Sequence, residues 1–196
     1  VVFELLVGSS YHLIATILSG GGLFYLLIIS APYRLSRFLT FLNPEANPMG
    51  SGYQLRNALI AIGSGGLFGL GFGSSSQKYL YLPEAHTDSI FAIISEELGF
   101  LRTVLVIVAF LFLAWRGFQI AQQAPDRFGR LLAGGITTWL VVQAFINIGS
   151  MLGLIPLTGL TLPFISYGGT SLVVSLAGIG ILLNISKHSS VAQQRK

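Results

Sequence analysis

The chain has 196 residues, of which 53% are hydrophobic and 9% are charged, and its mean hydropathy is +0.75. Soluble domains carry about 25% charged residues, so this composition excludes a soluble globular class and predicts an all-α integral membrane protein. The chain has no cysteine, which excludes a disulfide framework and a thiolate metal site. No shift in composition marks a second domain, so residues 1–196 are expected to form a single membrane domain.

Four apolar stretches are long enough to cross a bilayer, which takes about 20 helical residues. They lie at about residues 11–31, 98–115, 131–150 and 166–186. Residues 32–88 form a connection far longer than the usual few residues, and loops of that size are usually functional. Within it, residues 59–73 are apolar but too short to cross and are broken by glycine. We expect a re-entrant or interfacial segment there.

The basic residues predict the orientation, because short cytoplasmic connections retain Lys and Arg. Residues 116–130 carry three arginines and one aspartate, and the tail from Lys187 carries three basic residues and no acidic one. Residues 151–165 carry no charge. We therefore expect the two basic segments, and with them the C-terminus, in the cytoplasm, and residues 32–88 on the outer face. The pI near 9.6 then reflects topology and gives little reason to expect nucleic-acid binding.

Ionisable side chains gather just before the second span, in the stretch LPEAHTDSIF at residues 82–91. Charge at the edge of a bilayer is costly, so such a cluster is a candidate functional site. Asp88 suits either the N-cap of the entering helix or a general base, and the residues alone do not choose between these roles. Glu84 lies four residues before Asp88, so on a helix the two carboxylates share a face and resist simultaneous ionisation. His86 is expected to be a hydrogen-bonding support rather than a metal ligand.

Polar residues also occur at the edge and in the interior of later spans. Glu96 and Glu97 precede the second span and Arg102 follows, which predicts an interfacial ion pair or a solvated collar, with lining of the site as the alternative. Gln143 and Asn147 are four residues apart, on one face of the third span. Interhelical hydrogen bonds are the usual role of such amides.

Five motifs follow one another along the chain. They are RFLTFLNP at 37–44, GYQL at 52–55, IAIGSGGLFG at 60–69, LPEAHTDSIF at 82–91 with EELG at 96–99, and LPFISYGGTS at 162–171. In this order they resemble the SEDS family of shape, elongation, division and sporulation proteins. The PEAHTD form is more similar to the FtsW-like division or sporulation type than to the elongation type. Ser89 and Ser95 depart from the usual Phe and Gly without removing a charge.

The resemblance implies a ten-helix peptidoglycan glycosyltransferase that polymerises lipid II at the outer face of the bacterial cytoplasmic membrane, with a class B penicillin-binding protein as partner. The chain would be the C-terminal half of that fold. The resemblance implies Asp88 as the catalytic aspartate, which as a general base takes a proton from the incoming sugar hydroxyl. Glu84, His86 and Glu97 are then its candidate supports.

The pyrophosphate that leaves in this reaction needs positive charge. Four basic residues on the predicted outer face are candidates: Arg34, Arg37, Arg56 and Lys78. A divalent cation such as Mg²⁺ or Mn²⁺ could share the task, and contact with lipid headgroups is the alternative role for each side chain.

Pro156 and Pro163 stiffen the uncharged loop at residues 151–163, which has no evident partner in the chain. Exposed apolar surface suggests a protein contact, and the resemblance implies that the partner synthase binds there, with simple turn chemistry as the alternative. Two other functions use the same membrane class: a lipid II flippase or transporter, and a non-enzymatic scaffold that recruits a synthase. A carrier needs ionisable groups near the midplane, whereas the predicted spans carry almost none away from their ends.

Overall fold

The computed structural model describes residues 10–43, 50–75 and 86–194, some of those in the first and last helices by backbone alone. These ranges contain six helices and no strand, so the all-α prediction is confirmed. The helices are α2 (Ser10–Ile29), α3 (Pro32–Leu42), α4 (Ser51–Ser64), α6 (Ile90–Gln123), α7 (Arg127–Met151) and α8 (Gly169–Gln194).

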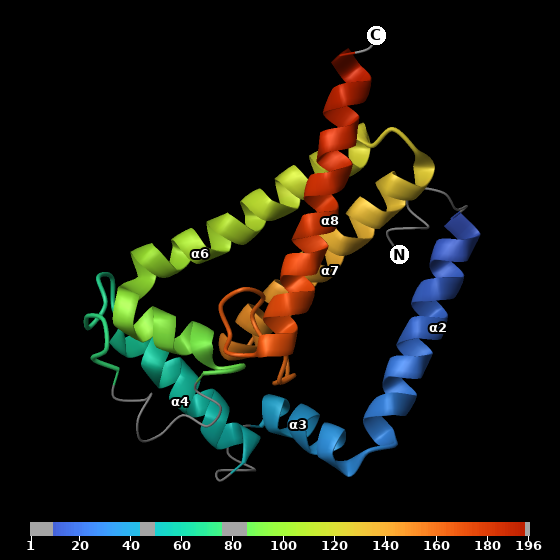
Figure 1. Ribbon diagram of the computed structural model, residues 1–196. Coiled ribbons are helices and arrows are strands. Elements are labelled where there is room, and N and C mark those ends of the chain that lie inside the picture. The colour runs from blue at the N-terminus through green and yellow to red at the C-terminus, as the bar shows by residue number, and fades with distance from the viewer. Residues whose placement is uncertain (1–9, 44–49, 76–85, 195–196) are drawn as a thin grey trace.

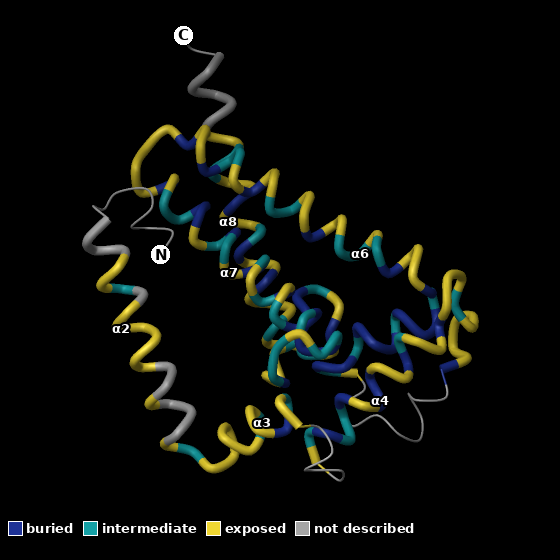
Figure 2. The backbone as a smooth tube through the Cα atoms, turned by 180° about the vertical axis from the view of Figure 1, so that it is seen from behind, coloured by how far each residue is buried: buried dark blue, intermediate teal, exposed yellow. Residues whose placement is uncertain are grey.

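Helices α6 and α7 run side by side and α8 packs against both, while α2 stands apart from this group and contacts α3 (Figure 1). Burial is uneven over the molecule: α3 is mostly exposed, whereas the region around α4 and the start of α6 is largely buried (Figure 2). Buried residues gather where α4, the first turns of α6 and the end of α7 meet. This cluster includes Phe91, Ala92 and Ile93, so the candidate site at Asp88 adjoins the larger buried cluster of the described residues.

Three helices in the described ranges are long and apolar enough to cross a membrane: α6, α7 and residues Gly169–His188 of α8. Helix α2 coincides with the first of the four predicted spans, but its described apolar stretch, Ile14–Leu23, is shorter than a span. Large apolar side chains are exposed along the membrane part of α6, as expected of a surface that faces lipid. They include Leu105, Val108, Leu111, Phe112 and Trp115.

The connection at residues 32–88 is more structured than its prediction as a loop. Helix α3 begins with Pro32, whose fixed φ and missing N–H suit a first helical turn. Helix α4 buries Leu55, Ala58 and Ala61 against the start of α6. The polar composition of the segment hides these helices because each buries only a narrow face.

The predicted re-entrant segment at residues 59–73 starts as the end of α4 and continues as a glycine loop, residues 65–71, that lies against α6. Gly99 breaks α6 there, with a φ of 77° and a ψ of 174° that no helix contains. Four backbone hydrogen bonds join the loop to the break. They run from the N–H groups of Leu70 and Gly71 to the carbonyls of Glu96 and Glu97, and from those of Phe100 and Leu101 to the carbonyls of Gly66 and Leu67, at 2.8–3.3 Å. The loop thus bonds backbone groups that the break releases from helical pairing.

Only glycine fits at the closest approach of the two backbones. A Cβ on Gly99 would lie 2.2 Å from the nitrogen of Gly69, and a Cβ on Gly69 would lie 2.2 Å from the carbonyl oxygen of Glu97. Both glycines also have positive φ, which side chains disfavour. Two glycines of the IAIGSGGLFG motif, Gly65 and Gly69, are therefore explained by a backbone contact with α6, since a Cβ on Gly65 would likewise lie 2.1 Å from the carbonyl oxygen of Ser95.

Candidate functional site

Asp88 lies at the entrance to α6 and is 7% exposed. The helix begins at Ile90, its N-cap position is Ser89, and no side chain makes a capping hydrogen bond there. Of the two roles predicted for Asp88, the N-cap is therefore not supported by the helix boundary.

Two side chains donate to the Asp88 carboxylate. Nε2 of Gln54, on α4, lies 3.4 Å from Oδ2 of Asp88 and also donates to Oγ of Ser89 at 3.0 Å. Oγ1 of Thr87 lies 3.3 Å from Oδ1. Donors of this kind fix the direction of a buried carboxylate and offset part of its lost hydration. Sequence reasoning did not single out Gln54.

Asn147 holds the backbone of Asp88 in place. Its side chain on α7 is fully buried, and Nδ2 donates to the carbonyl of Asp88 at 2.8 Å and to the carbonyl of Leu160 at 2.6 Å. One amide thus joins the site segment to the loop that follows α7. Asn147 has a structural role, as predicted, but the expected interhelical hydrogen bond is wrong, because both of its acceptors are loop carbonyls. Gln143, one turn away, likewise donates to the carbonyl of Thr161 at 2.9 Å.

The LPFISYGGTS motif fastens the residues before Asp88. Oγ of Ser166 donates to the carbonyl of Thr87 at 2.5 Å and accepts from the N–H of Leu162 at 2.7 Å. The N–H of Tyr167 donates to the carbonyl of His86 at 2.8 Å. The His86 side chain is exposed, so the structure shows His86 supporting the site through its backbone.

Arg37 is the predicted basic residue that the structure brings to Asp88. Its Nη1 donates to the carbonyl of Leu157 at 3.1 Å, and its guanidinium lies 4.4 Å from the centre of the Tyr33 ring. A Cβ on Gly159 would lie 3.5 Å from Nη1 of Arg37 and 3.7 Å from Oδ2 of Asp88. A guanidinium and a carboxylate therefore lie beside the same glycine.

Arg34 and Arg56 are not among the groups beside Gly159. Arg34 is exposed on the first turn of α3. Arg56 is exposed on α4, two residues from Gln54 and so on the opposite side of that helix. Lys78 and the candidate support Glu84 lie outside the described residues.

Glu96 and Glu97 do not form the solvated collar predicted for them, because they are only 2% and 6% exposed. Glu96 accepts a short hydrogen bond from the buried Ser75 hydroxyl, and Oε1 of Glu97 has no partner among the described residues. Arg102, the predicted ion-pair partner, donates to the carbonyl of Phe68. Both carboxylates lie at the α6 break, about 10 Å of helix beyond Ile90, so a supporting role for Glu97 at Asp88 stays a prediction.

The loop after α7 is not the unpartnered segment that its composition suggested. Leu157, Leu162 and Pro163 are buried within the chain, and Pro156 is half-buried. Leu154, at 69% exposed, offers more free apolar surface than either proline. The prediction of a partner contact at Pro156 and Pro163 assumed that both side chains are exposed. This assumption is wrong for Pro163, whose side chain is buried within the chain.

In the described ranges, no three side chains of His, Cys, Asp or Glu gather as a metal site. Asp88 alone still fits Mg²⁺, which proteins often hold through one or two carboxylates together with substrate phosphates. The predicted divalent cation stays a prediction.

Comparisons with known proteins agree on one family. The family model described as "Cell cycle protein", for FtsW, RodA and SpoVE, matches residues 1–191. Stage V sporulation protein E of Bacillus subtilis (strain 168) is 53% identical over 163 residues, which are 83% of this chain and 44% of that protein. A Geobacter metallireducens protein named "Probable peptidoglycan glycosyltransferase FtsW" is 48% identical over 162 residues, 83% of this chain and 43% of its own length. The chain thus spans less than half of these curated relatives.

Solved structures similar to this chain include the following two. One, described as "Structural coordination of polymerization and crosslinking by a peptidoglycan synthase complex", contains a chain with a TM-score of 0.71 and 28% identity, covering 96% of this chain and 52% of that one. The other, a mutant of the rod shape determining protein RodA of Thermus thermophilus, gives a TM-score of 0.52 and 38% identity, covering 66% and 39%. Together with the three apolar helices, these relatives indicate a bacterial membrane protein. The chain belongs to the FtsW/RodA/SpoVE family of cell cycle proteins, the family that its motifs predict.

Proposed function

We propose that this chain carries the catalytic site of a peptidoglycan glycosyltransferase that polymerises lipid II, with Asp88 as general base. The observation that carries the proposal is that the buried Asp88 carboxylate and the Arg37 guanidinium both lie beside Gly159, with the Asp88 segment fixed by Gln54 and Asn147. A base and a cation at one point are what this transfer requires.

The reaction assigns a task to each charge. A sugar hydroxyl of the incoming lipid II attacks the anomeric carbon of the growing strand and gives its proton to Asp88. The new glycosidic bond forms as the bond to the polyprenyl pyrophosphate breaks, and the leaving group takes that electron pair. Arg37 stabilises the negative charge that develops on the pyrophosphate. Its stacking on Tyr33 and its bond to the Leu157 carbonyl hold it in position for that contact.

The decisive test is Asp88→Asn in the complete protein that contains this sequence, assayed for glycan strands from purified lipid II with a class B penicillin-binding protein present. Loss of the base should lower the rate by about 10²- to 10⁴-fold. Folding should be kept, because an Asn oxygen can accept from Gln54 while its NH₂ donates to the Thr87 hydroxyl. Asp126→Asn is the matched control, since Asp126 caps α7 through Gly129 and Asn caps as well as Asp. Near wild-type polymerisation by Asp88→Asn would show that Asp88 is not the base, whereas an inactive wild-type protein would favour the flippase or the scaffold.

Arg37→Gln should also reduce polymerisation, whereas Arg56→Gln, on the far side of α4, should change it little. Equal losses in the two variants would indicate general attraction to lipid headgroups instead of a contact with the pyrophosphate.

The partner is proposed to be a class B penicillin-binding protein that contacts the loop at residues 151–163. The similar synthase complex, whose description names both polymerisation and crosslinking, supports this pairing. Pro156→Ala should weaken co-purification of the partner, and Pro163→Ala should act only through the fold of the loop. Pro125→Ala, in the connection between α6 and α7, is the matched control. Unchanged co-purification in all three variants would favour simple turn chemistry.

The proposed orientation places α3, α4 and Asp88 outside and the α6–α7 connection with the C-terminus inside. Because the chain has no cysteine, single substitutions can report the side directly. Ser74 and Gln122 are exposed and lie toward opposite ends of the membrane helices, so Ser74→Cys and Gln122→Cys should react with an impermeant reagent from opposite faces. Labelling of both from one face would contradict the topology.

A further inference from the structure

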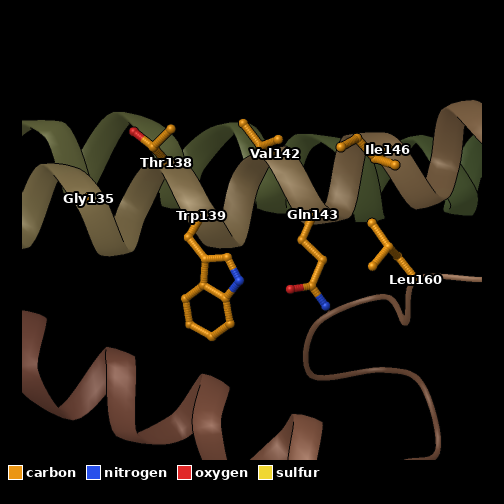
Figure 3. Close-up of a pocket in the computed structure, with 7 residues that line it drawn as sticks. All are labelled: Gly135, Thr138, Trp139, Val142, Gln143, Ile146 and Leu160. Carbon is orange, nitrogen blue, oxygen red and sulfur yellow. The ribbon is translucent and has the colours of Figure 1, made fainter. Parts of the chain in front are cut away.

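An apolar groove runs along one face of α7. It extends from Gly135 through Trp139, Val142 and Ile146 to Leu160 in the following loop, and its volume is about 500 Å³. Figure 3 shows the side chains of Trp139 and Gln143 on the same side of α7, with the loop that carries Leu160 at the far end. The walls are hydrocarbon and indole, except where Gln143 and Thr138 contribute polar atoms.

The end of the groove at Leu160 adjoins the candidate active site. The carbonyl of Leu160 and the carbonyl of Asp88 accept hydrogen bonds from the same amide, that of Asn147. The preceding residue, Gly159, is the one beside which Arg37 and Asp88 lie. A molecule whose tail occupied the groove would therefore present its head to the carboxylate and the guanidinium.

The length of the groove fits a membrane lipid tail. Gly135 and Ile146 are eleven residues apart, about 17 Å along the helix and roughly half of a 30 Å hydrocarbon layer. The groove thus runs from the end of α7 that carries the site past the middle of the predicted span at residues 131–150. A water-soluble substrate would gain nothing from contact with an apolar groove, which argues against such a ligand. An ordinary phospholipid could fill the groove but would bring no sugar to Asp88.

We infer that this groove binds the polyprenyl tail of a lipid-linked sugar substrate and so sets the position of its pyrophosphate beside Arg37. The inference rests on the proposed glycosyltransferase function for the identity of the head group. It adds a tail site on α7 to the charged site at Asp88.

The test places a photo-crosslinking residue in the groove of the complete protein in nanodiscs. Trp139→p-benzoylphenylalanine preserves an aromatic side chain at the wall, and Trp115→p-benzoylphenylalanine is the matched control on the exposed face of α6. The probe is radiolabelled polyprenyl pyrophosphate, with a radiolabelled phospholipid in parallel. We expect the polyprenyl adduct at position 139 to exceed that at 115 by about tenfold or more, the ratio expected when a tail buries apolar surface. Unlabelled polyprenyl pyrophosphate should compete it away.

Filling the groove provides the second measurement. Val142→Phe in the position-139 background should abolish the adduct, whereas Val173→Phe, on the exposed surface of α8, should not. If Val142→Phe does not fold, Ile146→Phe tests the same point.

Equal polyprenyl and phospholipid labelling at position 139 would overturn the inference, because it would show a general lipid surface. The absence of any adduct would overturn it as well, because another protein segment would then cover the groove. If position 139 gives no polyprenyl adduct but polymerisation still depends on Asp88, the tail site alone is refuted. If the adduct forms but Asp88→Asn still polymerises, the catalytic proposal alone is refuted.

Discussion

The first segment of α6, from Ile90 to the break at Gly99, is held at its two ends by different kinds of contact. At its start, near Asp88, side chains make the contacts: the Gln54 and Asn147 amides bond the carboxylate and the backbone of Asp88. At its end, near Gly99, backbone groups make the contacts, and two glycines allow them by having no side chain. The start should therefore respond to the loss of functional groups, and the break to the addition of even one methyl group.

The largest effect is expected from Gly99→Ala. The added Cβ meets the backbone of Gly69 at 2.2 Å, and its positive φ adds about 1–3 kcal/mol of strain. Separating the backbones also weakens four hydrogen bonds, so the free energy of unfolding should fall by about 3 kcal/mol or more. Thermal denaturation in detergent measures this. Gly63→Ala, where a Cβ meets nothing within 4 Å, should be nearly neutral. A Gly99→Ala protein of normal stability would show that the glycine loop and α6 can separate at Gly99 without a loss of free energy.

Asn147→Leu should have the next largest effect. It keeps an apolar side chain in a fully buried position but leaves the carbonyls of Asp88 and Leu160 without their donor. An unsatisfied buried polar group costs about 1–3 kcal/mol, so stability should fall by about 2 kcal/mol or more. Polymerisation should fall further than stability alone explains, because Asp88 loses its anchor. Gln122→Leu removes an exposed amide and is the control. Equal denaturation of the two variants would mean that water replaces the Asn147 amide.

Gln54→Leu should mainly affect activity. It removes the donor to Oδ2 of Asp88 while α4 keeps its buried face, so we expect a loss of about 1 kcal/mol in stability. The rate of strand formation should fall by roughly tenfold if that bond aims the base, a change equal to about 1.4 kcal/mol. Gln54→Asn, with a shorter side chain, should not rescue it. A wild-type rate in Gln54→Leu would show that Thr87 and the backbone anchors suffice.

Gly159→Ala should have the smallest effect and isolates the strain contribution. Gly159 has a positive φ of 71°, close to the 77° of Gly99, but its Cβ would meet Arg37 and Asp88 only at ordinary contact distances of 3.5 and 3.7 Å. We therefore expect a loss of about 1 kcal/mol. The difference between the two alanine variants in the same denaturation assay measures the cost of the backbone clash at Gly99. If Gly159→Ala is as damaging as Gly99→Ala, backbone strain rather than close approach dominates at both sites.

The sequence predicts well those features that one segment determines alone. The apolar runs of α6, α7 and α8 suffice to identify three membrane helices, and the costly charges before α6 point to Asp88. Prediction from the sequence fails where two segments that are distant in the chain contact each other. Glu96 and Glu97 look like a collar at a helix edge, and only the glycine loop from 30 residues earlier shows why they are buried. Arg37 could not be separated from Arg34 and Arg56, because the choice depends on which helix face meets the loop at Leu157. Gln54 carried no charge to attract notice.

The backbone pairing of the glycine loop has a consequence for its side chains. Because main-chain atoms face α6, the large apolar side chains of the loop point outward. Leu67, Phe68 and Leu70 are 60%, 73% and 50% exposed, and Phe72 just beyond the loop is 91% exposed. In a bilayer we expect these groups to partition into the hydrocarbon edge, each favoured by about 1.5–3 kcal/mol on full burial. The loop would then fix the depth of the first segment of α6 in the membrane, and with it the height at which Asp88 meets the head group of a lipid.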